Sequence, residues 1–158
     1  MRRIADLPNP EAWWYGRLLR PGVIEQIFTL GQRIDTDPEI GVDGRQLEGR
    51  LVEVVDRGLV LLRTVGLAGP TLVRIALHGL DDVDLYGGPG RGRLRIPSLA
   101  LATILVPDGA DASAGFLRPA FDDLWLAGGH ADGSPSYGDG RWEGYDEDDR
   151  YRFRHWPT

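Results

Sequence analysis

The 158-residue sequence contains no cysteine, no lysine and only one methionine. Without cysteine the chain cannot form a disulfide, present a thiolate nucleophile or bind zinc through sulfur. Without lysine it has no side-chain amine for Schiff-base chemistry and cannot carry the lysine of a phosphate-binding P-loop. All eighteen basic residues are arginines.

Signals for membrane insertion and secretion are also missing. No apolar run approaches the ~20 residues that a helix needs to cross a bilayer. The first six residues, MRRIAD, lack the apolar region of a secretion signal. We therefore expect a cytoplasmic protein that does not contact membranes. The net charge of −6 weighs against non-specific binding to nucleic acid.

The residues that are present indicate one folded domain with many turns. The hydrophobic fraction of 42% is sufficient for a core, and 22 glycines with 11 prolines favour short strands joined by turns. From residue 128 onward aliphatic side chains almost disappear, and Gly, Asp, Ser, Arg and aromatic residues dominate. We therefore expect a single compact domain over 1–127 and a Gly/Asp/aromatic-rich extension over 128–158.

Two helices are predicted near the N-terminus. Asn9 can cap a helix, Pro10 suits its first position, and Glu11 complements its positive end; this helix would end before Pro21. A second helix is predicted over 23–33, where apolar residues recur at three- and four-residue spacing.

The stretch 43–86 is predicted to form the β core. Apolar and polar residues alternate from Leu47 to Leu51 as in a half-buried strand, and further strands are expected over 59–62, 72–77 and 83–85. A slip of the alternation after Leu51 predicts a bulge or strong bend. The expected fold is therefore α+β, with the N-terminal helices packed on a small, strongly bent antiparallel β-barrel.

Two more elements are expected before the extension. The run 99–106 favours a buried strand because of its length and its Thr103-Ile104 pair. A short helix is expected after Arg118, with Phe121, Leu124 and Trp125 facing inward and Gly128 as its stop.

Part of the stretch 43–86 resembles a known family. The residues that carry the likeness are Asp43-Gly44-Arg45, Leu47, Gly49, Leu51, Asp56 and Leu61. They are similar to the first motif of Sm/Lsm-like (SH3-like) small β-barrels, in which a turn ending in Gly-Arg precedes a G-x-L strand and an acidic turn. The family's RNA-contacting asparagine is not found around 58–60, and its second motif is absent from 73–86. The resemblance therefore implies a small barrel.

The loop 87–93 is the best candidate for anion binding. Arg91, Arg93 and Arg95 are interleaved with glycines and could bring guanidinium groups and backbone N–H groups to a phosphate, RNA or DNA. The alternative is a hairpin loop whose arginines balance the nearby acidic residues. Those residues are Asp81, Asp82 and Asp84.

Aromatic residues at both ends of the chain are candidates for partner binding, because aromatic side chains and arginine are favoured in interfaces. These candidates are Trp13, Trp14, Tyr15, Trp142, Tyr145, Tyr151, Phe153 and Trp156. Tyr151 and Phe153 alternate with arginines at strand spacing, so this segment is a candidate edge strand for its own barrel or for a neighbouring subunit.

Catalytic patterns are weak. His130 and Asp132, with Asp122 nearby in sequence, are the only set that suggests a metal enzyme or small hydrolase. No serine lies in a G-x-S-x-G motif, and no cofactor or metal site is predicted. The sequence favours a non-catalytic binding or assembly module that acts through protein–protein contacts or self-association. Nucleic-acid binding through the arginine loop and a His130/Asp132 enzyme remain the alternatives.

Overall fold

The computed structural model describes residues 14–19, 22–29, 32–33, 40–110 and 113–144. These residues form a mixed α+β fold with two helices and several small sheets, none of which closes into a barrel within the described ranges. The helices are α1 (Gly44–Thr64) and α2 (Ala114–Ala127). The strands are β1 (Trp14–Leu19), β2 (Val23–Phe28), β3 (Gln32–Arg33), β4 (Ile40–Asp43), β5 (Thr71–Val73), β6 (Ala76–His78), β7 (Asp81–Tyr86), β8 (Gly92–Arg95), β9 (Ser98–Ala100), β10 (Ile104–Val106), β11 (Tyr137–Gly138) and β12 (Arg141–Trp142).

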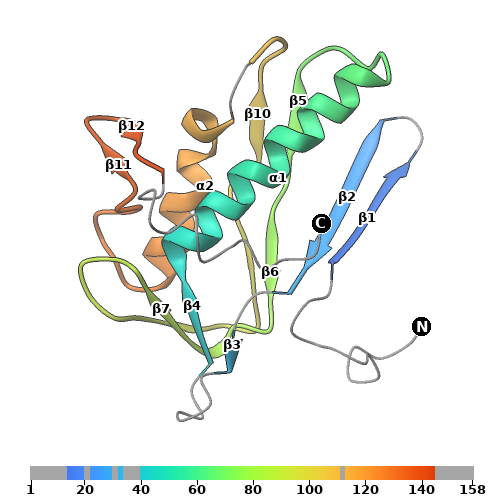
Figure 1. The fold of residues 1–158 in the computed structure, drawn as a ribbon. Coiled ribbons are helices and arrows are strands. Elements are labelled where there is room, and N and C mark those ends of the chain that lie inside the picture. The colour runs from blue at the N-terminus through green and yellow to red at the C-terminus, as the bar shows by residue number, and fades with distance from the viewer. Residues whose placement is uncertain (1–13, 20–21, 30–31, 34–39, 111–112, 145–158) are drawn as a thin grey trace.

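Helix α1 crosses the molecule between the β1–β2 hairpin and α2 (Figure 1). It begins at Asp43, whose Oδ1 accepts a hydrogen bond from Gln46 N at 3.1 Å, as an N-cap should. Its last turn closes with Leu67 N donating to Leu62 O at 2.9 Å, next to Gly66 with φ +79°. This is the Schellman ending, in which a glycine takes the left-handed conformation just beyond the helix.

The segment from Thr71 to Val106 is one long, bent antiparallel hairpin. Its two arms pair as β5 with β10, β6 with β9, and β7 with β8. The arms are interrupted near residues 74–75 and 101–103, and the register shifts again between Asp81 and Val83. Such irregularities bend a ribbon sharply. The strand predicted over 83–85 lies within β7, whereas the predicted strand range 72–77 is divided between β5 and β6 and the range 99–106 between β9 and β10.

The distal part of the ribbon extends into a four-stranded sheet of order β3-β4-β7-β8. β4 pairs with β7 in parallel, and α1 lies in the connection between them. The core lies between this sheet, the ribbon and the two helices. Its most deeply enclosed large side chains include Trp125, Phe121 and Leu124 of α2, all 0% exposed, so the predicted inward face of this helix and its stop at Gly128 are confirmed.

The predicted N-terminal helices are wrong in the described residues. Residues 14–19 and 23–28 form an antiparallel hairpin instead, which suits their aromatic and β-branched side chains. Gly22, expected to follow a helix end, has φ +96° and donates its N–H to Leu19 O at 3.0 Å. The glycine therefore ends a hairpin turn, for which the left-handed conformation is typical.

The strands predicted between residues 47 and 62 are also wrong. Helix α1 covers the whole stretch, including most of the residues that resemble the first Sm/Lsm motif. Leu47, Leu51, Leu59 and Leu62 recur at spacings that place them on one buried helical face. The alternation of apolar and polar residues over 47–51 is compatible with a strand and with a helix. The helical spacing of the leucines over 47–62 favours the helix. Neither described helix is long and apolar enough to cross a membrane.

Candidate functional site

The outward side of the β1–β2 hairpin carries an unusual concentration of exposed apolar side chains. In an antiparallel pair, residues directly opposite each other point to the same face, and the register opposes Tyr15 to Ile27 and Leu19 to Val23. These four side chains are 37%, 46%, 37% and 50% exposed. Between the two rows lies the pair Arg17 and Glu25. We call this set the outer hairpin face: Tyr15, Arg17, Leu19, Val23, Glu25 and Ile27.

On the other side of the hairpin, β2 packs against the body of the protein, whereas Leu18 of β1 is 47% exposed. Ile24 and Phe28 are partly buried, and Phe28 packs against the hydrophobic core. A Cβ placed on Gly58 of α1 would lie 3.7 Å from Ile24 Cδ1. Alternation along the strands therefore points Tyr15, Leu19, Val23 and Ile27 away from the core.

The charges of the outer hairpin face are organised within the hairpin. Arg17 Nε lies 2.5 Å from Glu25 Oε2, and the Arg17 guanidinium lies 5.9 Å from the centre of the Tyr15 ring. The hydrogen bond to Glu25 and the charge of that carboxylate raise the pKa of Arg17 above its usual value. The face thus presents a cation and an anion side by side, bordered above and below by apolar rows.

The end of α1 carries further exposed apolar side chains near the hairpin turn. Leu61 and Val65 are 42% and 47% exposed and follow Gly58 at helical spacing, so they lie on the side of α1 that faces the inner side of the hairpin and are not part of the outer hairpin face. Leu67, 44% exposed, packs directly against Gly22.

The arginine loop is paired with acidic residues of its own hairpin. Arg91 forms an ion pair with Asp84, and Arg93 Nε lies 2.7 Å from Asp82 Oδ1. Arg95 is exposed and lies opposite Asp81 in the register. Arg93 holds the pKa of Asp82 below its usual value. Arg91 and Arg93 thus pair with neighbouring acids, as the alternative interpretation of this loop expects.

A buried glutamate links both helices to the segment after α2. Glu48 is 0% exposed; its Oε1 accepts hydrogen bonds from Trp125 Nε1 at 2.5 Å and from Ser134 Oγ at 2.6 Å. Burial raises the pKa of Glu48, while the donors around it, including Ser136 and Trp142, lower that pKa in part. Enclosed in this way, the carboxyl group joins α1, α2 and the segment that follows α2.

The structure places the three residues of the predicted enzyme in different surroundings. His130 packs edge-on against Trp125 with ring centres 4.9 Å apart. Asp122 Oδ1 accepts a hydrogen bond from Ser134 N at 2.9 Å, and Asp132 is exposed. Across the described residues, no group of three or more His, Asp or Glu side chains is placed to hold a metal ion.

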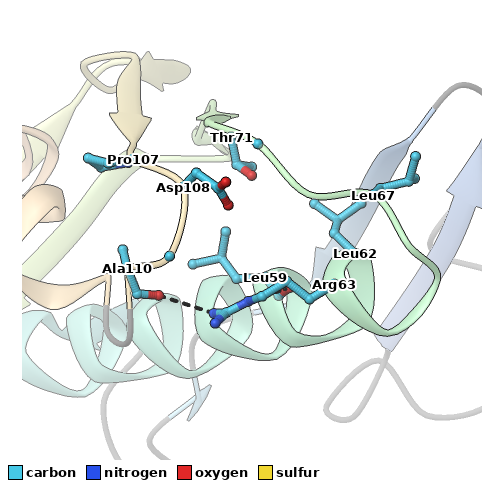
Figure 2. A pocket seen from close by; sticks show the side chains of 10 residues that line it. Leu59, Leu62, Arg63, Leu67, Thr71, Pro107, Asp108 and Ala110 are labelled. Carbon is cyan, nitrogen blue, oxygen red and sulfur yellow. Dashed lines mark hydrogen bonds between the residues drawn. The ribbon is translucent and has the colours of Figure 1, made fainter.

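A small pocket lies where the end of α1 meets the open end of the ribbon (Figure 2). Leu59, Leu62 and Arg63 line it from the helix, and Arg63 Nη2 donates to Ala110 O at 3.1 Å across its rim. The enclosed volume is about 10 Å³. That volume suits one water molecule, whereas small-molecule sites usually measure ~300 Å³ or more.

The aromatic residues predicted to bind partners fall into three groups. Trp14 and Tyr15 lie in β1, and Tyr15 belongs to the outer hairpin face. Trp142 lies in β12 and packs partly buried against the core. The rest lie outside the described residues: Trp13, Tyr145, Tyr151, Phe153 and Trp156.

Sequence reasoning missed five members of the outer hairpin face and the Glu48 cluster. The signal for the face was present as alternation: Tyr15, Arg17 and Leu19 on one strand, and Val23, Glu25 and Ile27 on the other. The helical interpretation of both segments concealed it. No local signal joins Glu48 to Ser134, because the two residues are 86 positions apart.

Comparison with known proteins gives no relative for this chain: no family model, curated protein or solved structure matches it.

Proposed function

We propose that this protein is a non-catalytic binding or assembly module and that the outer hairpin face makes its protein–protein contacts. The observation that supports this proposal is the gathering of four exposed large apolar side chains on a face of only six residues. Single exposed apolar residues are normal on protein surfaces, whereas clusters of them mark interaction sites.

The chemistry of the face suits protein recognition. Tyrosine and arginine are enriched among the residues that contribute most to interface affinity, and Tyr15 and Arg17 lie next to each other with the cation near the ring. The surrounding leucine, valine and isoleucine would exclude water from the Arg17–Glu25 pair once a partner covers them. Exclusion of water strengthens such charged contacts and makes them more selective.

Site-specific photo-crosslinking in the host cell tests this function. A photoreactive amino acid at Ile27 of the full chain should give a covalent adduct with a protein, because the partner covers this position. The matched control places the same group at Leu126 of α2, which is 52% exposed but lies outside the face. Val23→Glu, which adds a charge to the face, should abolish the Ile27 adduct. Equal adducts from both positions, or none from Ile27, would refute the proposal.

A further inference from the structure

We propose that the partner of the outer hairpin face is the same face of a second copy of this chain, packed across a two-fold axis parallel to the strands. This inference rests on the proposed function and specifies its partner. It is argued from the arrangement of charged and apolar rows on the face. This arrangement is complementary to itself when the two-fold axis runs parallel to the strands.

The register divides the face into three rows of two residues each. The rows are Tyr15 with Ile27, Arg17 with Glu25, and Leu19 with Val23. In every row the β1 residue differs from its β2 neighbour, and in the central row the two residues carry opposite charges. A symmetric dimer uses the same patch on both subunits, so the patch must be complementary to itself.

Two orientations of an in-plane two-fold axis are possible when two such hairpins pack face to face. An axis parallel to the strands exchanges β1 with β2 within each row. Arg17 of one copy then faces Glu25 of the other, Tyr15 faces the second Ile27, and Leu19 faces the second Val23. The result is a ring of four alternating charges between two apolar rows.

An axis perpendicular to the strands gives an unfavourable arrangement. It leaves the central row in place and sets Arg17 against Arg17 and Glu25 against Glu25. Like charges brought together in an interface are strongly unfavourable. The charge pattern therefore selects the parallel axis, with sheets at the usual spacing of ~10 Å and an angle of ~30° between their strands.

The size of the face predicts the strength of the dimer. Six residues on each side are far fewer than the ~20–30 residues per partner of a standard stable interface. Dissociation in the micromolar range is therefore expected, and the measurement must extend to about 1 mM protein.

Charge inversion at the central row tests the inference. Sedimentation velocity of the full chain should show a concentration-dependent dimer. Arg17→Glu makes the central row wholly acidic and Glu25→Arg makes it wholly basic, so each variant alone should dissociate at least tenfold more readily. An equimolar mixture of the two variants should dimerise again, because the rows are now opposite in charge. Arg17→Glu combined with Glu25→Arg in one chain should also restore the dimer.

The matched control is the inversion of an ion pair outside the face. Arg57 and Glu53 pair on the exposed side of α1, and Arg57→Glu should leave dimerisation unchanged. Circular dichroism of each variant confirms that the chain is folded. A wild-type chain that stays monomeric to about 1 mM, or variants that dimerise as well alone as when mixed, overturns the inference. An Ile27 adduct with a different protein alongside a monomeric chain would leave the proposed function standing and remove only the second copy.

Discussion

Glu48 is a fully buried carboxylate that joins distant parts of the chain. A buried carboxylate is costly unless donors surround it. Here Trp125 and Ser134 donate directly, and each belongs to a different part of the chain from Glu48. The carboxyl group thereby fixes how α1, α2 and the segment that follows α2 meet. All the donors that lower its pKa are neutral side chains, and burial outweighs them.

Glu48→Gln should change how stability depends on pH. Because burial raises the pKa of Glu48 above its usual value of 4.5, the folded chain binds this proton more tightly than the unfolded chain. The free energy of unfolding therefore falls as pH rises from 4.5 through the raised pKa, and this loss is absent below that range. The variant lacks this ionisation.

The measurement is urea unfolding of wild type and Glu48→Gln from about pH 4 to about pH 8. This window begins near the usual pKa of a carboxyl group and extends well above it. The stability of Glu48→Gln relative to wild type should increase with pH. Glu53→Gln, an exposed carboxyl on the same helix, should track the wild type within about 1 kcal/mol. A difference between Glu48→Gln and wild type that does not vary with pH would contradict the role given to burial.

Arg91→Ala and Arg93→Ala form a matched pair at the ribbon's loop end. Both remove an arginine that pairs with an aspartate, but the Asp84 side chain is 7% exposed and the Asp82 side chain 70%. Loss of the cation beside a buried carboxylate should destabilise the fold by about 1–3 kcal/mol, whereas Arg93→Ala should have little measurable effect. Thermal unfolding distinguishes the two variants. Equal losses of stability in the two variants would show that burial of the paired aspartate does not determine the effect.

At the scale of elements, the difficulty lies in telling helix from strand in a leucine- and valine-rich chain. Residues 44–64 contain both an alternating stretch and a helical period, and the hydrogen bonds at the two ends, Asp43 to Gln46 and Leu67 to Leu62, stabilise the helix. Gly58 lies in the interior of this helix. In the strand interpretation the same glycine would come directly before the strand predicted over 59–62.

Gly58→Ala separates these two structures. In a helix interior alanine is favoured over glycine by about 0.5–1 kcal/mol, and the added Cβ would meet only Ile24 Cδ1, at an ordinary 3.7 Å. The variant should therefore be more stable to urea by about that amount. Gly44→Ala is the opposing control, because its Cβ would overlap the Trp125 ring and should destabilise the fold. A destabilised Gly58→Ala chain would contradict the helix.

The elements that the sequence predicted correctly have local, unambiguous signals. The strands of the ribbon are short apolar runs between glycine and proline turns, and α2 carries inward-facing Phe121, Leu124 and Trp125 before Gly128. The β1–β2 hairpin was wrongly predicted as helical because its apolar residues also recur at helical spacing. The Glu48 cluster could not be predicted, since it depends on contacts between residues far apart in the chain.

At the scale of the whole molecule, the helices, ribbon and four-stranded sheet enclose the core, while the β1–β2 hairpin lies at one side of α1 with its apolar outer face exposed (Figure 1). Arg91 and Arg93 of the ribbon loop pair with aspartates. The outer hairpin face gathers four exposed apolar side chains around an ion pair, and we propose that a protein partner covers it.

Photo-crosslinking from Ile27 in the host cell, compared with Leu126, tests that claim most directly. The account predicts a protein adduct from Ile27 that disappears in the Val23→Glu chain, and no adduct from Leu126. The account is contradicted if the chain with the photoreactive group at position 27 forms no adduct. It is also contradicted if that adduct forms equally well in the Val23→Glu variant.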